Sequence, residues 1–378
     1  MKWSLRIGSI IGIPIKVHLT FILLLVLVFF AGTKVIGLGG LAGVIFICLV
    51  FASVVFHELA HSLVARHYGI EVVDITLLPI GGVARMAKPP EKPAQEMLIA
   101  AAGPAASFAL AVALLITADL VGSKIPVSDF SLRTNLIAQL CAVNFVLAVF
   151  NLVPAFPMDG GRILRGFLGL YLHPLKATRI AVGVGQVFAA ILFFLGLLSM
   201  NLFMILIALF VYIGAESEEK QMGVMLTLEG VTAKSTMITD LEVVSPEHRI
   251  GEVADRYCHS FQGDFPVVDD RGLTGLVTRE TLTEALHKLG PSVKVGEIMR
   301  VDYPIALEDT PLTEILQKMQ EAGSKVVPIM RQRELVGLVT LEQIGRYNML
   351  CAGFSCEFIH PGRTDPSKQA DSAHEPQP

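Results

Sequence analysis

Three ionisable residues lie close together inside a long apolar stretch of the chain. They form the motif His57-Glu58-Leu59-Ala60-His61. His57 and His61 are four residues apart, so on a helix their imidazoles share one face and can bind the same metal ion. Glu58 lies beside that face, where its carboxylate can take a proton from an attacking water molecule. The alternative is a pair of buried histidines bonded only to backbone or to neighbouring helices. The metal site is favoured, because all three residues are costly within a membrane span unless they have partners.

A catalytic zinc site takes three protein ligands and leaves one position open, so a third ligand must lie elsewhere in the chain. Asp159 is the candidate, at the end of another apolar stretch and just before Gly160 and Gly161. Two prolines precede it and interrupt regular helix, which at membrane depth is tolerated only where the backbone lines protein or water. The alternative for Asp159 is an ordinary carboxylate at the end of a helix.

The elements that must position these residues are apolar helices. Windows of about 19 residues indicate six candidate spans, at 18–37, 41–66, 97–121, 135–153, 180–198 and 201–215. The first span could instead be a signal peptide, but no small-residue cleavage site follows it. We therefore expect a multi-spanning α-helical membrane protein of about six transmembrane helices.

Composition separates this membrane half from a soluble half. Charged residues make up 17% of the whole chain, but 26 of them fall in residues 1–220 and 38 in residues 221–378. The first part therefore has the composition of a membrane domain and the second that of a soluble one. Five cysteines are too few for a disulfide scaffold, and a net charge of −4 gives no indication of nucleic-acid binding.

The distribution of Lys and Arg predicts the orientation in the cell membrane. If the N-terminus is cytoplasmic, the segments on that side hold twelve of these residues and the segments outside hold three. Because positive charge accumulates in short cytoplasmic loops, we expect both termini and the soluble half to be cytoplasmic. The loop at 124–133 is then external.

The two motifs together resemble the site-2 protease family of intramembrane zinc metalloproteases. The resemblance rests on His57-Glu58-x-x-His61 in one span and on the segment from Asn151 through Pro154 and Pro157 to Asp159-Gly160 in another. It extends to the segments 12–18, 79–86 and 103–107.

The resemblance implies roles for individual residues. His57, His61 and Asp159 match the zinc ligands, with one zinc ion per chain, and Glu58 matches the catalytic base. Asn151 matches an asparagine near the substrate. The implied reaction is hydrolysis of peptide bonds in or near the transmembrane segments of membrane proteins, and we expect single-span substrates.

Other motifs in the membrane half have less specific readings. Gly81 and Gly82 could form a plain turn, or could offer an extended backbone edge to a substrate strand. The small residues from Gly103 to Ser107 let helices approach closely, so we expect them to serve packing and not chemistry. His18 and His67, near the membrane boundary, are not expected to be ligands.

The soluble half contains an internal repeat with an offset of 62 residues. The recurring pairs are Met237 and Met299, Pro266 and Pro328, Gly275 and Gly337, Leu276 and Leu338, Val277 and Val339, and Thr278 and Thr340. Each unit combines a helix, a short apolar strand, Gly-Leu-Val-Thr and a further helix. The repeat resembles a tandem of cystathionine-beta-synthase (CBS) domains, a module that often binds adenine nucleotides.

We therefore divide the chain into a membrane-embedded metalloprotease domain (1–220), two CBS domains (221–290 and 291–350) and a disordered tail (351–378). The nucleotide motif of the CBS family ends in a carboxylate, but Thr281 and Gln343 stand at that position here. Thr278 and Thr340 remain available for phosphate. Weak binding of an adenine nucleotide and a purely structural or dimerising role are both open.

Two other functions fit the composition: a CBS-regulated membrane transporter, or a non-catalytic scaffold that keeps the fold. A transporter would not need Glu58 next to the first ligand, and the six spans contain no evident inverted repeat. A scaffold would be expected to have lost Glu58 or a ligand. The protease is therefore favoured.

Overall fold

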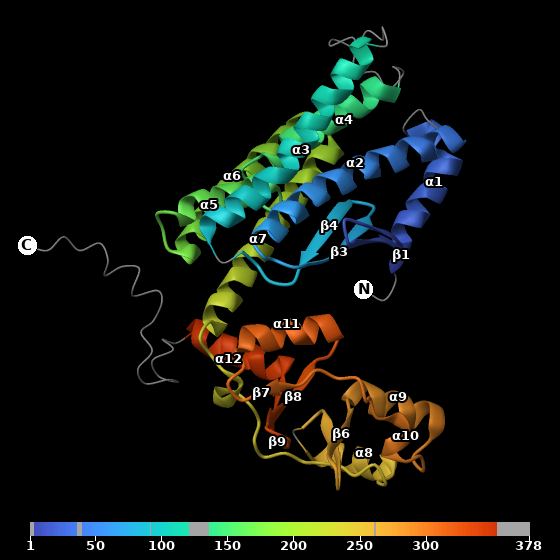
Figure 1. Cartoon of the computed structure of the whole chain (residues 1–378), viewed down its shortest axis with the longest axis vertical. Coiled ribbons are helices and arrows are strands. Elements are labelled where there is room, and N and C mark those ends of the chain that lie inside the picture. The colour runs from blue at the N-terminus through green and yellow to red at the C-terminus, as the bar shows by residue number, and fades with distance from the viewer. Residues whose placement is uncertain (1–3, 36–39, 91, 121–135, 261, 354–378) are drawn as a thin grey trace, which may run out of the picture. The chain divides into compact units, whose positions relative to one another are not determined.

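The computed structural model describes residues 4–35, 40–90, 92–120, 136–260 and 262–353. The chain divides into two compact units, Met1–Met222 and Gly223–Pro378 (Figure 1). The predicted external loop at 124–133 and most of the predicted tail lie outside the described residues.

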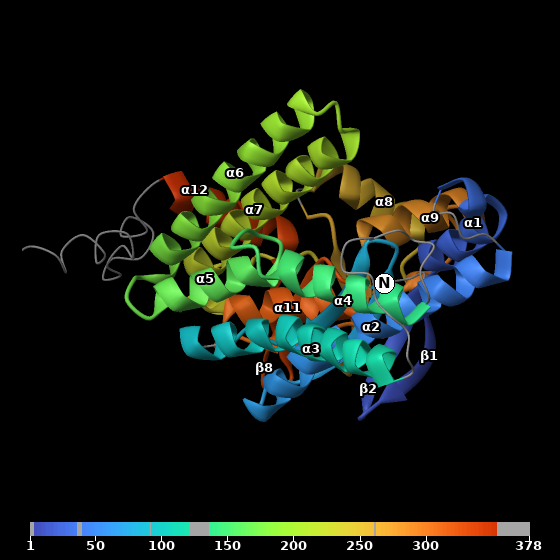
Figure 2. The ribbon, with the colours of Figure 1, turned by 90° about the horizontal axis from the view of Figure 1, so that it is seen from above.

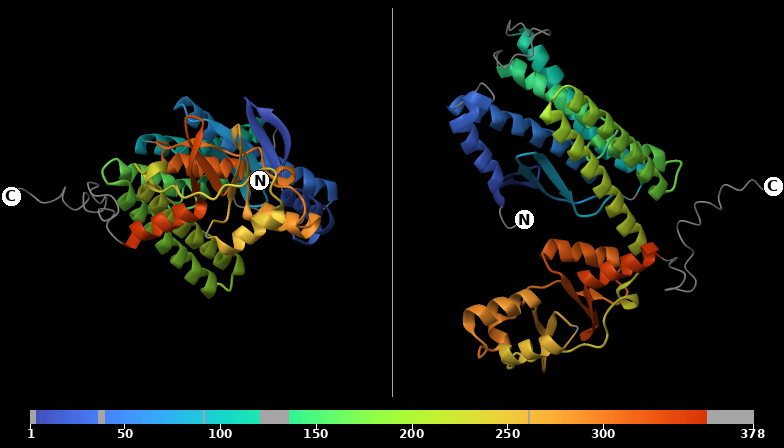
Figure 3. Two further views of the ribbon diagram at one scale, coloured as in Figure 1. Left: turned by 90° about the horizontal axis from the view of Figure 1, so that it is seen from below. Right: turned by 180° about the vertical axis from the view of Figure 1, so that it is seen from behind.

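The first unit contains a helix for each of the six apolar stretches. They are α1 (Leu19–Val35), α2 (Gly40–His67), α3 (Pro93–Leu120), α4 (Leu136–Asn151), α6 (Pro174–Leu198) and α7 (Leu202–Leu228) (Figures 1 and 3). Among the described residues, α2, α3 and α6 are long and apolar enough to cross a membrane, while α4 and the Leu19–Phe30 part of α1 are shorter. Large apolar side chains such as Phe30 and Leu198 are exposed on these helices, as a surface in lipid requires. The chain is therefore a membrane protein, and six crossings remains a prediction.

A four-stranded sheet, which the hydropathy pattern does not predict, accompanies these helices. Its strands are β1 (Ser4–Ile10), β2 (Ile13–His18), β3 (Val72–Leu78) and β4 (Gly81–Met86), in that spatial order. The outer pairs are antiparallel and β2 runs parallel to β3. Ile11 and Gly12, both at positive φ (52° and 78°), form the two-residue turn that joins β1 to β2.

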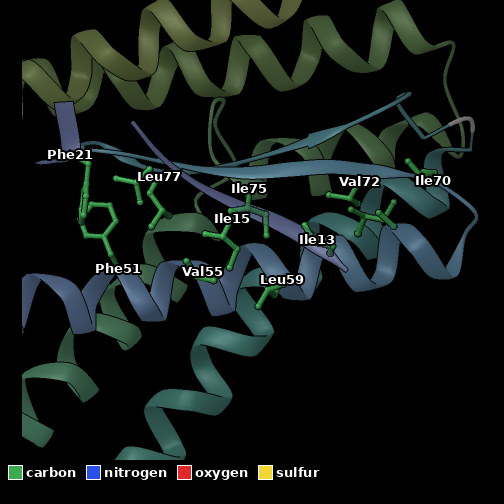
Figure 4. Close-up of a cluster of buried hydrophobic side chains, with 13 residues drawn as sticks. Ile13, Ile15, Phe21, Phe51, Val55, Leu59, Ile70, Val72, Ile75 and Leu77 are labelled. Atoms are coloured by element: carbon green, nitrogen blue, oxygen red, sulfur yellow. The ribbon is translucent and has the colours of Figure 1, made fainter. Parts of the chain in front are cut away.

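The sheet packs on one face of α2. Ile13, Ile15 and Val17 alternate along β2 and point into a buried cluster with β3. Phe51, Val55 and Leu59, four residues apart on α2, close this cluster from the helix side (Figure 4). His57 and His61 are offset by two residues from that series, which is about 200° around a helix. The helix therefore packs on the sheet with one face and turns its histidines the opposite way.

A short amphipathic helix, α5 (Asp159–Gly169), follows α4, and α3 packs against α2, α4 and α5 (Figure 2). The fifth helix begins with the predicted ligand Asp159. Because α3 contacts both α2 and α5, it lies beside each of the elements that carry predicted ligands.

The second unit consists of two α/β halves. The first holds η1 (Ala233–Ser235), α8 (Ile250–His259), β5 (Phe265–Asp269), β6 (Gly272–Val277) and α9 (Arg279–Leu289). The second holds α10 (Val295–Ile298), β7 (Ala306–Leu307), α11 (Leu312–Ala322), β8 (Val326–Arg331), β9 (Glu334–Thr340) and α12 (Leu341–Gly353). Two sheets result, β5-β6 and β7-β8-β9.

The halves exchange their first segments. Ile238, at the start of the first half, pairs with Leu338 on β9, and Arg300, at the start of the second, pairs with Leu276 on β6. These bridges are related by the repeat offset of 62. The hydrophobic clusters follow the same exchange, because Leu228 and Val231 belong to the core of the second half and Val295 to that of the first.

Candidate metal centre

Three predicted ligands meet at one point of the first unit. His57 and His61 of α2 are 4% and 6% exposed, and their Nε2 atoms are 3.1 Å apart. Asp159 Oδ2 lies 3.1 Å from His57 Nε2 and 3.1 Å from His61 Nε2. Two imidazole nitrogens and one carboxylate oxygen therefore form a nearly equilateral triangle in a buried site.

This triangle fits a zinc ion. Ligand atoms placed tetrahedrally at roughly 2.0–2.1 Å from zinc are about 3.3 Å apart, close to the spacing seen here. Nitrogen and oxygen donors in this ratio are typical of catalytic zinc sites, which keep a further position open. The donor set and its spacing thus agree with the metal that the sequence predicts.

Two glycines allow the chain to deliver Asp159. The segment between α4 and α5 folds back over the first turn of α5, so a methyl group on Gly160 would overlap the carbonyl oxygens of Leu152 and Val153. A methyl group on Gly161 would lie 2.7 Å from Phe156 N. Only glycine permits this close approach. The approach fixes the position of Asp159 as the first residue of α5.

The second nitrogen of each imidazole is bonded to α3. His57 Nδ1 lies 2.9 Å from Ser107 Oγ, and His61 Nδ1 donates to the carbonyl oxygen of Ile99 at 2.6 Å. Both Nε2 atoms are therefore left to face Asp159. The expectation that the segment from Gly103 to Ser107 serves packing alone is wrong in this respect, because the hydroxyl of Ser107 contacts a predicted ligand.

Glu58 faces the sheet. Its Oε2 accepts a hydrogen bond from the backbone N–H of Ala84 on β4 at 3.3 Å. A methyl group on Gly82 would lie 2.8 Å from Glu58 Cγ and 3.0 Å from Val54 Cγ1, so β4 rests directly on this side of α2. Because β3 pairs with one edge of β4, the amide of Ala84 that reaches Glu58 belongs to the other edge.

The predicted substrate residues lie around this strand and at the end of α4. Gly81 begins β4 with φ at 142°, and a methyl group added to it would meet no atom within 4 Å. Asn151 is half-buried as the last residue of α4, and its Nδ2 donates to Leu147 O at 3.0 Å.

Thr278 and Thr340, the residues predicted to contact phosphate, cap helices of the second unit. Thr278 Oγ1 accepts from the backbone N–H of Thr281 at 3.2 Å, and Thr340 Oγ1 accepts from that of Gln343 at 3.1 Å. Each hydroxyl thus stabilises the first turn of the helix that follows.

A cavity of about 1010 Å³ opens elsewhere in the second unit, between its two halves. Asp240, Arg331 and Arg333 are among its lining residues.

Comparison with known proteins connects this geometry to a family. The family model described as peptidase family M50 matches residues 45–132 and 126–195, which include the three predicted ligands and Glu58. The CBS domain model matches residues 233–288 and 295–348.

Relatives match along almost the whole chain. Zinc metalloprotease MJ0392 of Methanocaldococcus jannaschii is 39% identical over 354 residues, which is 92% of this chain and 96% of that protein. Putative zinc metalloprotease sll0528 of Synechocystis sp. is 31% identical over 363 residues, covering 90% and 94% respectively. Among solved structures, a site-2 protease from Methanocaldococcus jannaschii shares 44% identity, with a TM-score of 0.44, over 57% of this chain and 95% of that one.

Proposed function

Because the chain belongs to peptidase family M50, the site-2 protease family of intramembrane zinc metalloproteases, we propose that His57, His61 and Asp159 hold its zinc ion. The chain is a zinc metalloendopeptidase with a CBS regulatory module. The observation that carries the ligand assignment is the triangle of two Nε2 atoms and Asp159 Oδ2, with each side 3.1 Å long.

Glu58 is the general base of this proposal. A zinc ion at the site supplies Lewis-acid catalysis and lowers the pKa of water. Glu58 takes a proton from the attacking water molecule while the water oxygen bonds to the peptide carbonyl carbon. The same carboxyl group then gives that proton to the amide nitrogen as the C–N bond breaks. The N–H of Ala84 holds the Glu58 carboxylate on the side of β4 in the resting site.

The proposed substrates are single-span membrane proteins. A peptide bond inside a helix cannot be attacked until the helix unwinds, and unwinding in lipid leaves polar backbone groups unsatisfied. The enzyme must supply replacements, and the outer edge of β4 at Gly81 and Gly82 is suited to pair with an extended segment. The amide of Asn151 is a further candidate. Substrates with helix-weakening Gly, Pro or Asn near the cut should therefore be preferred.

The location and organisation follow from the charge pattern and the repeats. We propose a multi-pass protein of the cell membrane with both termini cytoplasmic, made of a metalloprotease domain (1–220) and CBS domains at 221–290 and 291–350. Dimerisation through the CBS module and weak adenine-nucleotide binding at Thr278 and Thr340 belong to the same proposal.

A Glu58→Gln variant tests the mechanism. Glutamine keeps the size of the side chain and leaves the three ligands in place, so purified protein should retain about one zinc per chain while cleavage is abolished. Zinc is measured by elemental analysis, and cleavage by gel assay on a single-span substrate in proteoliposomes.

Glu71→Gln is the matched control, because Glu71 is exposed just before β3. It should cleave like wild type. Normal cleavage by Glu58→Gln would overturn the role of the base, and normal zinc content in His57→Ala would overturn the ligand assignment.

A further inference from the structure

Three residues of α3, spaced four apart, face the histidines of α2. Ile99, Gly103 and Ser107 share one helical face because of this spacing. Ser107 meets His57, and Ile99 meets His61 one turn further along α2. The two helices thus form an antiparallel ladder, with Gly103 between its two rungs.

Each of these two contacts influences which ring nitrogen of the histidine carries the proton. A neutral imidazole has one N–H, so an Nε2 that binds metal requires the proton on Nδ1. A carbonyl oxygen can only accept, so Ile99 O fixes this tautomer for His61. The hydroxyl of Ser107 can accept in the same way from Nδ1–H of His57.

We propose that Ser107 is the positioning residue for His57: its hydroxyl oxygen accepts the Nδ1 proton and holds the ring with Nε2 towards Asp159. This inference rests on the proposed zinc site. Partners of this kind orient metal-binding histidines and raise the basicity of the ligating nitrogen.

Packing alone does not account for a serine at this place. Ser107 is fully buried, and Ala111, one turn further along α3, is also buried and presents only a methyl group. An alanine at 107 would fill nearly the same space. A buried hydroxyl without a partner is destabilising, and the structure gives this one a partner in His57.

The test compares zinc affinities of the full-length protein, measured by competition with a chelator. Ser107→Ala should bind zinc about 10–100-fold more weakly than wild type. Ser107→Thr, which keeps a hydroxyl, should restore most of that affinity. Ser107→Gly also removes the hydroxyl and gives a second measurement should alanine impair folding.

Ser53→Ala is the matched control. Ser53 is a buried serine of the same bundle, and it donates to Leu49 O and accepts from Asn144 Nδ2. Its variant should keep wild-type zinc affinity. Thermal unfolding of the zinc-free proteins is recorded in parallel, because a packing role would lower stability without weakening zinc binding.

The outcomes separate this inference from the proposed function. Unchanged zinc affinity in both Ser107→Ala and Ser107→Gly would overturn the positioning role and leave the zinc site intact. A wild-type protein that binds no zinc, or a His57→Ala variant that binds it normally, would instead overturn the proposed site.

Discussion

Gly103 leaves the space into which the Nε2 atoms of both histidines, the proposed zinc ligands, project. A methyl carbon on this residue would lie 2.6 Å from His57 Nε2 and would overlap His61 Nε2. The rings can avoid it by turning their Nε2 atoms away from Asp159. We therefore predict that Gly103→Ala folds but loses zinc and, with it, cleavage.

Gly183→Ala provides the matched control, because a methyl group on Gly183 of α6 meets no atom within 4 Å. Its zinc content, measured by elemental analysis, should equal that of wild type. Equal zinc in Gly103→Ala would show that the imidazoles adjust without losing the metal.

The sequence predicts some of these residues better than others. His57 and His61 are four apart, so the helical repeat alone places them on one face. Asp159 was predicted from the irregular backbone around it, and the structure brings all three together. Ser107 lies 50 residues from His57 in the chain. Its small size made packing the natural reading, because a contact between two helices leaves no local pattern.

At the scale of the elements, a cluster of charged residues links three strands of the sheet in the first unit. Asp74 of β3 is fully buried and accepts hydrogen bonds from Lys16 of β2 at 2.6 Å and from Arg85 of β4. Burial would raise the pKa of this carboxyl, but the two cations outweigh it and lower the pKa to about 2. The charged form of Asp74 therefore stabilises three adjacent strands.

The pKa of Asp74 predicts acid sensitivity. An unfolded aspartate has a pKa of about 3.9, above the folded value, so this stabilisation is present above pH 4. It should be lost as the pH falls from about 4 to about 2. The thermal midpoint of wild type should drop over this range, and Asp74→Asn should lack that component.

At neutral pH we expect Asp74→Asn to be less stable by about 2 kcal/mol. This is below the loss for fully buried pairs, because Lys16 and Arg85 are partly exposed. Glu71→Gln, which removes an exposed carboxylate beside the same strand, is the control. Identical acid profiles for wild type and Asp74→Asn would contradict the prediction.

The helices were more predictable than these strands. An apolar stretch long enough to cross a membrane is visible in the sequence without any tertiary contact, so each predicted stretch overlaps one of the six helices. The strands are short, and β3 is buried at four consecutive residues, from Asp74 to Leu77, so it lacks clear alternation. Its paired residues on β2 lie 60 positions earlier in the chain. Such pairing depends on tertiary contacts that the sequence does not show directly.

At the scale of the whole molecule, α7 belongs to both units. In the first unit a methyl group on Gly214 would lie 2.6 Å from Pro157, two residues before Asp159. Glu218 accepts from Arg165 of α5 at 3.1 Å. In the second unit Leu228, the last residue of α7, is fully buried in the core of the second half. Side chains from different parts of α7 therefore pack beside α5 in the first unit and in the core of the second half of the second unit.

Nucleotide binding to the second unit is the proposed means of control. A nucleotide can shift the equilibrium between two conformations of the enzyme only if it binds them with different affinities. Thr278 and Thr340 already cap helices, and Thr281 and Gln343 stand where the family has a carboxylate. We expect ATP and AMP to bind the segment 223–353 weakly, with Kd on the order of 1 mM, against about 1 μM for a well-built site. Calorimetric titration measures this.

Truncation after Gln221 tests whether the module acts at all. It removes the end of α7 that packs in the CBS core, so the remaining helix should fray and the cleavage rate in proteoliposomes should change. Any response of cleavage to ATP or AMP should disappear with it. The control is a chain that ends at residue 353, which keeps both CBS halves and should behave like wild type. Micromolar nucleotide binding would show that the two replaced carboxylates are dispensable. An unchanged cleavage rate and unchanged nucleotide response after truncation would exclude regulation through α7.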